Sequence, residues 1–348
     1  MPASETIGFA ILGTGMAADY HRQAIAANTA LGARLVAVGH YDPARFAEIG
    51  ARFGVPCLTE EQVVAHPGVQ VVCICTPSGQ HAAQAIAAAR AGKHVLVEKP
   101  MALSLADTDA MIATCDAAGT ALGVVLQRRA MPLFERIRRA ILAGELGELT
   151  LGVVTVPYSR PQAYYDQADW RGTWALDGGG VLMNQGIHLV DLLVWYMGDP
   201  VAVAAYAGTL RRKIEVEDTL AATLRFPGGA LATITATTAI EPGFPHRLEV
   251  YGTRGGIQVE GESVVRWEAT GSATESARAG NLASAGAGGD PRGIAPEGHV
   301  AIVRDFIEAV RTGRPPKVAG AEGRRSLAAV LAIYQAAGLL SRQPGSHE

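Results

Sequence analysis

Lys99 has a setting in which its amino group could act on a substrate. The chain has only four lysines beside 26 arginines, so lysine is rarely used here as a generic positive charge. Lys99 lies in Glu98-Lys99-Pro100, directly after the apolar run at 94–97 that predicts a short buried strand. Ligands of open α/β sheets bind at the carboxyl ends of strands, where a desolvated lysine can act on a substrate oxygen. The alternative is a surface lysine in a turn.

A second candidate group lies on a predicted helix at 181–195, which follows the glycine run at 178–180. Most of this helix is apolar, but Asn184, His188 and Asp191 are spaced i, i+4 and i+7 along one face. Polar side chains on a buried helix need partners, and a hydrogen-bonded core histidine is the alternative interpretation. The number of polar residues and their spacing favour a functional site.

Hydride transfer is the chemistry that these two groups fit. Oxidation of a secondary alcohol removes the hydroxyl proton while hydride leaves the carbon for a nicotinamide ring. Histidine has the pKa range of a general base, so His188 is the candidate acid/base, and Asp191 could orient its ring. Lys99 could stabilise alkoxide character on the reacting oxygen. Reduction runs the same steps backward, with His188 as the proton donor.

The elements that must position these residues begin with a glycine-rich turn. An apolar strand at 7–12 is followed by a helix that runs through Ala27, and the turn between them has the pattern G-x-G-x-x-A. Gly13 would allow the turn, Gly15 would let a pyrophosphate approach, and Ala18 would let helix and strand pack closely. Because amides at a helix N-terminus bind phosphate, the candidate cofactor site here is Gly13, Thr14, Gly15, Met16 and Ala17. A plain strand–helix turn is the alternative.

The residue after the second predicted strand (34–39) bears on the choice of cofactor. NAD-binding dinucleotide folds place an aspartate or glutamate there, about 20 residues after the glycines, for the ribose 2′-hydroxyl. This chain has His40, and Asp42 is expected to cap a turn before Pro43. Without the carboxylate, the repulsion against a 2′-phosphate is lost. We therefore expect a nicotinamide cofactor, NAD or NADP, with a preference for NADP(H) or use of both.

The other elements of the first third alternate, with strands at 69–75, 94–97 and 121–126 and helices at 79–91 and 107–118. This alternation predicts an α/β fold with a doubly wound parallel sheet, in a dinucleotide-binding domain at 1–126. The carboxyl ends of its strands share one edge. We expect six further residues near the cofactor there, Thr76, Pro77, Ser78, His81, Glu98 and Lys99. For His81, packing of its own helix explains the residue equally well.

Residues 127–348 predict a second, α+β domain for substrate binding and oligomerisation. A basic helix at 133–143 precedes predicted strands at 150–156, 201–210, 219–226, 230–239 and 247–251, which favour a mostly antiparallel sheet. A Gly-, Ala- and Ser-rich loop at 271–293 is expected to be mobile. Two final helices, at 299–312 and 323–340, could pack back near the first domain.

Bulk composition excludes several classes of function. A net charge of -3 gives no reason to expect nucleic acid or an anionic membrane as a partner. No apolar stretch reaches the ~18 residues of a membrane span, and the start lacks the basic region of a signal peptide. The four cysteines form no C-x-x-C pair, so we interpret them as reduced core residues of a cytoplasmic protein without a bound metal.

Three segments together resemble the Gfo/Idh/MocA family of sugar and cyclitol oxidoreductases. They are 11–15, the block at 91–100 that ends in Glu-Lys-Pro, and 178–191. The resemblance runs along nearly the whole chain. It implies an N-terminal Rossmann domain and a C-terminal domain whose large open sheet often forms contacts in a homodimer or homotetramer. It also implies that Lys99 and His188 act at the carbon of a small-molecule sugar or cyclitol that is oxidised or reduced.

One residue departs from the family pattern. Many members have an aspartate four residues before the histidine, where this chain has Asn184. An asparagine can hold a substrate hydroxyl but cannot take a proton. A proton relay would therefore run through His188, for which Asp191 is a candidate partner. Asparagine at this place also resembles a recurring variant of the family, so it does not imply loss of activity.

Further residues are expected to line the substrate pocket. Arginines suit a carboxylate or phosphate, and aromatic side chains suit the apolar face of a sugar ring. The candidates are Gln127 and Arg128 after the last strand of the first domain, and Arg160, Tyr164, Tyr165, Trp170, Arg171 and Asp177 before the glycine run. For each of them, packing at a surface or interface is the alternative.

Two other functions stay open on the sequence alone. Some relatives use a tightly held NAD transiently to break glycosidic bonds by elimination, and net sugar hydrolysis without net NADH would indicate that chemistry. The other is a nucleotide-binding protein without catalysis, for which Asn184 is the hint. Cofactor affinity without turnover on a broad sugar panel would indicate it.

Overall fold

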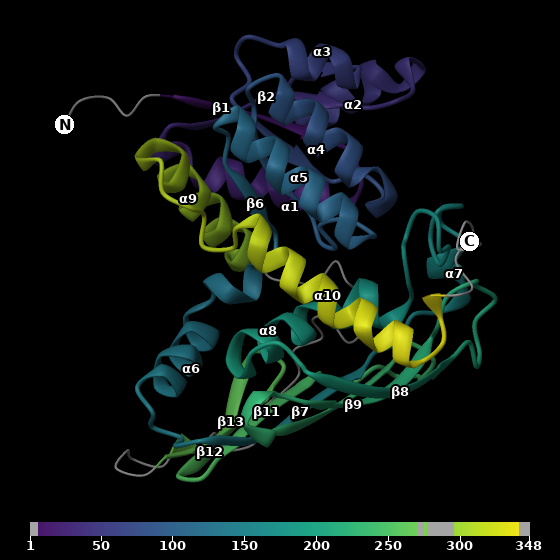
Figure 1. Cartoon of the computed structure of the whole chain (residues 1–348). Coiled ribbons are helices and arrows are strands. Elements are labelled where there is room, and N and C mark those ends of the chain that lie inside the picture. Colours follow the sequence, from purple (N-terminus) through teal and green to yellow (C-terminus); the bar gives the residue numbers. More distant parts are fainter. Residues whose placement is uncertain (1–5, 270–274, 277–295, 341–348) are drawn as a thin grey trace. The chain divides into compact units, whose positions relative to one another are not determined.

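The chain forms two compact units, which the computed structural model describes at residues 6–269, 275–276 and 296–340 (Figure 1). The first unit comprises Met1–Met131 and Pro296–Arg324, and the second comprises Pro132–Ala295 and Arg325–Glu348. Almost all of the expected 271–293 loop lies outside the described residues. Within the described residues, no helix is both long and apolar enough to cross a membrane.

The first unit is built on a six-stranded sheet in the order β3-β2-β1-β4-β5-β6. Its strands are β1 (Ile7–Leu12), β2 (Ala33–Gly39), β3 (Cys57–Leu58), β4 (Val71–Ile74), β5 (His94–Val97) and β6 (Leu122–Val124). Every neighbouring pair is parallel, which confirms the predicted doubly wound sheet. The strand order reverses between β1 and β4. Ligands of such sheets bind at the carboxyl ends beside that reversal.

Helices cover the faces of this sheet, with α4 and α5 packed together on one of them (Figure 1). The helices from the N-terminal part are α1 (Met16–Ala27), α2 (Phe46–Phe53), α3 (Glu60–Ala65), α4 (His81–Arg90) and α5 (Leu105–Ala118). Local signals set their ends. In α5, for example, Ser104 Oγ accepts a hydrogen bond from the Asp107 amide, and Gly119 stops the helix with a φ of +66°.

A helix from far along the sequence completes the first unit. Helix α9 (Glu297–Thr312) packs against α1, and Phe306 lies against Gly123 of β6. Helix α10 (Gly320–Ala336) follows, and the division between the units falls inside it. A single boundary after residue 126 therefore differs from the observed division. Apolar side chains of α9 belong to the core of the first unit, although the sequence places this helix about 170 residues after β6.

The second unit is built on an eight-stranded sheet in the order β14-β13-β12-β11-β7-β10-β9-β8. Its strands are β7 (Leu149–Pro157), β8 (Ala202–Gly208), β9 (Thr219–Arg225), β10 (Leu231–Thr237), β11 (Arg247–Gly252), β12 (Gly255–Glu260), β13 (Ser263–Ala269) and β14 (Glu275–Ser276). Only β7 and β10 pair in parallel among these strands, so the predicted mostly antiparallel sheet is confirmed. Strands β12 to β14 were not predicted: β12 opens on two glycines that carry no strand signal, and β14 lies within the loop expected at 271–293.

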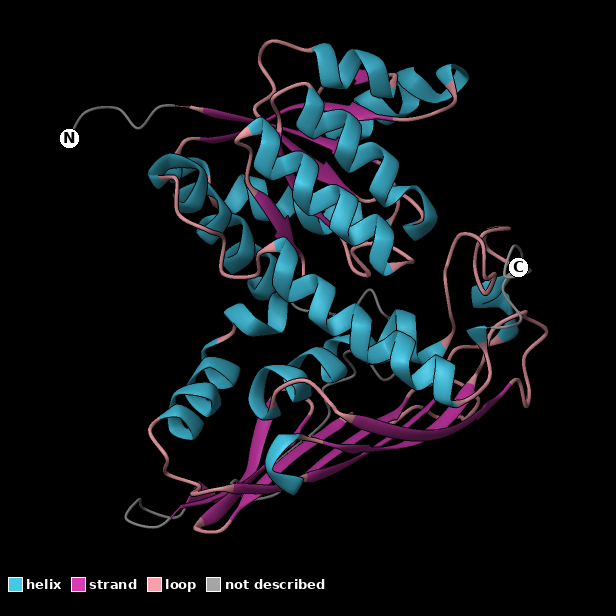
Figure 2. Cartoon of the chain, in the orientation of Figure 1, coloured by secondary structure: helices cyan, strands magenta, loops and turns pink. Residues whose placement is uncertain are grey.

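The second unit carries helices beside its sheet (Figure 2). They are α6 (Pro132–Leu142), the short α7 (Gln162–Tyr165) and α8 (Ile187–Met197). Helix α8 packs against β7, and α6 packs against α8. Leu193 and Met197 of α8 pack closely over Gly152 of β7, and an added Cβ there would displace their side chains. Along β9 and β10 buried and exposed residues alternate, so the opposite face of these strands is exposed.

The predicted helix at 181–195 is not a regular α-helix. Leu182–Gly186 forms a π-helical segment, and α8 begins only after it. A π turn is wider than an α turn, so the angle about the helix axis between Asn184 and His188 differs from that of an ideal α-helix. The predicted stripe of Asn184, His188 and Asp191 assumed an ideal α-helix, and this part of the prediction is corrected. Segments of π-helix occur frequently at functional sites.

Candidate active site

Gly13 and Gly15 follow the carboxyl end of β1 and have different surroundings. Gly13 has a φ of +91°, and an added Cβ would lie 2.5 Å from the Cys75 carbonyl oxygen, so only glycine fits there. Gly15 is the N-cap of α1, has an extended backbone, and has nothing within 4 Å of an added Cβ. A dinucleotide pyrophosphate fits this turn, because Gly15 is open and the first amides of α1 supply donors.

Substitution of the two glycines should separate folding from cofactor binding. Gly15→Ala should leave the melting temperature within about 2 °C of wild type, because its Cβ meets no protein atom. It should weaken dinucleotide binding by roughly tenfold or more, a loss of about 1.4 kcal/mol or more. Gly13→Ala should lower the melting temperature through its strained φ and backbone clash. Thermal melting and fluorescence titration measure both effects, and wild-type cofactor affinity in Gly15→Ala would exclude pyrophosphate approach at this residue.

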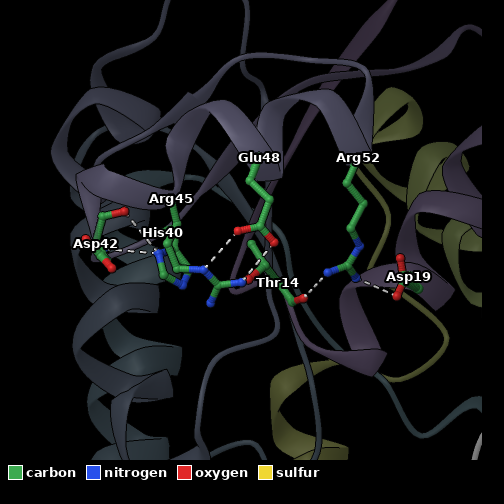
Figure 3. Close-up of polar contacts among 7 residues, drawn as sticks. All are labelled: Thr14, Asp19, His40, Asp42, Arg45, Glu48 and Arg52. Atoms are coloured by element: carbon green, nitrogen blue, oxygen red, sulfur yellow. Dashed lines mark hydrogen bonds and ion pairs between the residues drawn. The ribbon is translucent and has the colours of Figure 1, made fainter.

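The turn after β2 carries His40, where many dinucleotide folds have a carboxylate (Figure 3). His40 Nδ1 accepts a hydrogen bond from the Asp42 amide at 3.0 Å, which leaves the proton of a neutral ring on Nε2. Asp42 Oδ1 accepts from the Ala44 amide at 3.0 Å, so it caps this turn as predicted. Arg45 extends from the same turn and forms an exposed ion pair with Glu48 at 3.3 Å. The turn therefore presents two groups that can donate to an anion.

The segment after β4 contains the predicted cofactor residues Thr76, Pro77 and Ser78. Thr76 Oγ1 donates to Gln84 at 2.6 Å, and Ser78 is buried. His81 is 1% exposed, and its ring nitrogens lie 2.9 Å from the Thr76 carbonyl oxygen and 2.8 Å from that of Pro100. Burial lowers the pKa of His81. Its ring thus connects the loops that follow β4 and β5.

Lys99 lies directly after β5 and is half-buried, whereas the carboxylate of Glu98 beside it is buried. Glu98 Oε1 lies 3.1 Å from His21 Nε2 and 3.5 Å from His299 Nε2, and Oε2 accepts from the Lys99 amide at 3.3 Å. Burial opposes ionisation of Glu98, yet the hydrogen bonds to both histidines hold its pKa well below the usual value. Glu98 therefore anchors the backbone of Lys99 to α1 and α9, a role that the sequence analysis did not foresee.

Gln127 and Arg128 lie in a short 3₁₀ turn after β6 and are both buried. Gly298, at the start of α9, lies against Gln127, and an added Cβ would come within 2.8 Å of Gln127 Cγ. The neighbouring Arg129 is 1% exposed and pairs with Glu322. In the first unit this turn is therefore fixed by the C-terminal helices.

In the second unit, the three polar residues predicted on one helix, Asn184, His188 and Asp191, differ in burial and in hydrogen-bond partners. Asn184 is half-buried, and its Nδ2 donates to Asp177 Oδ1 at 2.7 Å. Asp177 is 4% exposed and also accepts from the Gly172 amide at 2.9 Å. His188 is half-buried, whereas Asp191 is 1% exposed and accepts from Ser326 Oγ at 2.5 Å. A buried carboxylate therefore lies beside Asn184, supplied by Asp177 rather than by the helix itself.

The predicted pocket arginines and aromatic residues form one cluster before the glycine run. The Tyr164 ring has the guanidinium of Arg171 4.4 Å and that of Arg160 5.5 Å from its centroid. Arg171 also lies 4.6 Å from the Trp170 ring and donates to the Tyr164 hydroxyl at 2.6 Å. Tyr165 is buried and bonds Thr238 Oγ1 at 2.9 Å, and burial raises its pKa to about 12.

Arg212 is a neighbour of this cluster that the sequence analysis missed. Its Nη2 donates to the Thr238 carbonyl oxygen at 3.2 Å, and the Arg160 amide donates to the same oxygen at 3.0 Å. Asp218 holds the turn of Arg212 by accepting from three consecutive amides, at 210 to 212. Only the pairing of β9 with β10 brings this turn beside Thr238, so no local sequence signal was available.

Comparison with known proteins places these features in a family. Residues 7–126 match the model of an oxidoreductase family with an NAD-binding Rossmann fold, and residues 134–258 match the GFO/IDH/MocA C-terminal domain. The inositol 2-dehydrogenase of Rhizobium meliloti is 30% identical over 76% of this chain and 78% of its own length. The chain belongs to the GFO/IDH/MocA family. It is an NAD(P)-dependent oxidoreductase that acts on CH–OH groups.

Two further relatives are named for, or were solved with, other carbohydrate compounds. The 1,5-anhydro-D-fructose reductase of Ensifer adhaerens is 30% identical over 80% of both chains. The WlbA dehydrogenase of Bordetella pertussis, solved in complex with NADH and UDP-GlcNAcA, is 34% identical. It has a TM-score of 0.85 and covers 96% of this chain and 97% of its own. The family is thus secure, while its members differ in the sugar they use.

Proposed function

We propose that the protein transfers a hydride between a nicotinamide cofactor and a secondary alcohol or ketone carbon of a sugar, sugar derivative or cyclitol. His188 acts as the acid/base, and Lys99 polarises the reacting oxygen. The observation that carries this proposal is the setting of Lys99, a half-buried amine at the carboxyl end of a Rossmann strand, with its backbone anchored by buried Glu98. The relatives that oxidise inositol or reduce anhydrofructose support the same chemistry.

Each step assigns a proton or a charge to a residue of this chain. In the oxidation, a neutral His188 takes the hydroxyl proton, and the ammonium of Lys99 stabilises the negative charge that develops on the oxygen. Asn184 holds a substrate hydroxyl, because its Nδ2 is oriented by Asp177. When bound at Gly13 to Ala17, the cofactor supplies the hydride acceptor or donor. Reduction reverses these roles, with His188 returning the proton.

The arginine-rich cluster points to a substrate that carries a negative charge. Arg160, Arg171 and Arg212 place three guanidinium groups around Tyr164 and Thr238, and such groups bind carboxylate or phosphate. Tyr164 and Trp170 offer aromatic faces for a sugar ring. We therefore propose a sugar acid or a sugar nucleotide, the chemistry named for the WlbA relative.

A substrate panel tests the proposed function directly. Neutral sugars, cyclitols, sugar acids and sugar nucleotides are each incubated with NAD and with NADP, and nicotinamide absorbance at 340 nm is followed. We expect turnover with at least one acidic member, at a higher kcat/KM than its neutral analogue. Net hydrolysis without reduced cofactor would reassign the chain to elimination chemistry. Cofactor binding without any turnover would reassign it to nucleotide binding alone.

For the cofactor we propose NADP, or use of both NADP and NAD. The turn after β2 offers the Nε2 proton of His40 and the exposed guanidinium of Arg45, and a 2′-phosphate would be bound by such donors. Asp42 is bonded to the Ala44 amide in its own turn. A measured preference for NAD(H) of a hundredfold or more would reject this proposal.

Arg45→Ala should separate the two cofactors. A charge-assisted hydrogen bond contributes about 1.5–3 kcal/mol, so kcat/KM for NADP(H) should fall roughly 10–100-fold. The value for NAD(H) should change less than about threefold, because no 2′-phosphate is present. Arg34→Ala is the matched control, since Arg34 is exposed near the opposite end of β2. Equal losses with both cofactors would remove Arg45 from 2′-phosphate recognition.

We also propose a homodimer or homotetramer that forms through the exposed face of the second unit's sheet. Threonine and alanine side chains dominate this face on β9 and β10, and Tyr206 on β8 is 86% exposed. Multi-angle light scattering measures the assembly state, and a monomer at micromolar concentration would contradict this assignment.

We also propose a cytoplasmic location, which the four free cysteines, three of them buried, support.

A further inference from the structure

Four consecutive backbone amides, at 180 to 183, are all bonded by two buried residues of the second unit, Glu217 and Tyr334. Glu217 Oε2 accepts from the Gly180 amide at 2.8 Å, and Oε1 accepts from the Leu182 amide at 3.0 Å. The Val181 amide donates to the carbonyl oxygen of Glu217 at 3.0 Å. The Met183 amide donates to the Tyr334 hydroxyl at 3.1 Å, and this hydroxyl donates to Glu217 Oε1 at 2.8 Å.

These amides are the ones that the start of a helix leaves without partners inside the helix. The next amide, that of Asn184, already donates to the Gly180 carbonyl oxygen at 2.9 Å, so the helical pattern begins there. Glu217 is 1% exposed and Tyr334 is fully buried. The pair therefore provides the complete cap of the segment that carries Asn184 and His188. A carboxylate at this end also interacts favourably with the helix dipole.

Two of the three glycines at 178–180 are explained by the same pair, while Gly178 has a positive φ of 78°. An added Cβ at Gly179 would lie 2.3 Å from the Tyr334 hydroxyl oxygen, and one at Gly180 would lie 1.7 Å from the Glu217 carbonyl oxygen. Side chains are excluded there because Glu217 and Tyr334 pack directly on the backbone. The direction in which the helix leaves this turn is consequently set by these contacts.

We propose that Glu217 and Tyr334 are positioning residues for the reaction, and that they act through Asn184 and His188 by capping their helix. This inference rests on the proposed function. The ionised carboxylate can accept from the Gly180 and Leu182 amides and from the Tyr334 hydroxyl at once. A protonated carboxyl would direct an O–H at one of these donors and break the cap. Turnover should therefore require the ionised form of Glu217.

The pH at which this requirement acts follows from the burial of Glu217. Burial raises its pKa to about 7, although the Leu182 amide, Tyr334 and the Gly180 amide favour the charged form. The titratable side chain that faces it from α10 is Tyr334, whose own pKa burial raises well above the usual value, so Tyr334 stays neutral. Activity should therefore rise with pH through about 7 as Glu217 ionises.

Glu217→Gln tests the proposal, with Glu215→Gln as its matched control. Glu215 is an exposed carboxylate two residues away that accepts from the Trp174 amide at 3.0 Å. Glu217→Gln should lower kcat by roughly 10–100-fold. The variant loses one acceptor oxygen for the amides at 180 and 182, so the helix that carries Asn184 and His188 shifts by a fraction of an ångström. The substitution should also abolish the pH dependence of amide protection at 180–188 near pH 7, which does not depend on His188, while the dinucleotide Kd stays within about twofold. Glu215→Gln should behave as wild type.

Two further measurements keep the proposal testable. If Glu217→Gln does not fold, Tyr334→Phe removes only the hydroxyl at the Met183 amide and should still lower kcat. Hydrogen exchange of a peptide at 180–188 reports the cap without turnover, and protection in the wild type should fall as the pH drops below about 7. Wild-type kcat, pH profile and exchange in both variants would overturn the proposal. A wild-type protein that turns over no substrate but shows pH-dependent exchange would overturn only the proposed function.

Discussion

Replacement of His188 by asparagine should lower turnover by roughly 10²–10⁴-fold, the contribution typical of a positioned general acid or base. Asparagine preserves a polar side chain of similar reach but cannot take the hydroxyl proton. Because the dinucleotide turn lies in the other unit, at Gly13 to Ala17, the Kd for the cofactor should stay within about twofold. Steady-state kinetics with the substrate that the panel identifies measure the first effect, and fluorescence titration measures the second.

His66→Asn is the matched control for this variant. His66 lies in a loop of the first unit and accepts from the Gly68 amide through Nδ1, a bond that an asparagine oxygen can also make. The His66→Asn variant should keep wild-type turnover. A loss of less than tenfold in His188→Asn would show that another group moves the proton. The next candidate for that group is Asp177, the buried carboxylate beside Asn184.

Lys99→Met should lower kcat by roughly 10²–10³-fold, the loss seen when one donor to a developing oxyanion is removed. Methionine matches the length and volume of the lysine stem, so Glu98 should keep its bonds to His21, His299 and the Lys99 amide. The effect should appear in kcat more than in KM, because the oxygen carries its charge only in the transition state.

Lys93→Met makes the same chemical change at a lysine with a structural role. Lys93 Nζ donates to the carbonyl oxygens of His66 and Val69, at 3.1 and 2.8 Å. This control should lower the melting temperature by a few degrees, since it removes the Nζ donor from two carbonyl oxygens, and should leave kcat within about threefold. If Lys99→Met also affected stability and left turnover unchanged, the surface-turn interpretation of Lys99 would be correct.

Patterns that are local in the sequence predicted a large part of this molecule. Apolar runs and glycine-bounded helices located five of the six parallel strands and most of their helices, because the period of a buried strand or helix is written in neighbouring residues, whereas the two-residue β3 was not predicted. The G-x-G-x-x-A turn predicts a cofactor site at the end of β1 for the same reason. Where the local signal was weak, as in β12 with its two leading glycines, the prediction failed.

Contacts between distant segments were beyond such patterns. The sequence predicted a polar stripe at Asn184, His188 and Asp191, but a π-helical segment interrupts it, and only the folded chain brings Asp177 to Asn184. The division of the units changed as well, because α9 completes the core of the first unit.

The sequence by itself therefore determined the family, the two kinds of sheet and the residue types that could do the chemistry. Lys99, His188 and the dinucleotide glycines are all recognisable from their immediate neighbours. Tertiary structure alone decided how these residues are held, through Glu98 between two histidines, and Glu217 with Tyr334 at four amides. The physical reason is that a buried polar group must find partners wherever the fold supplies them, and those partners are distant in the chain.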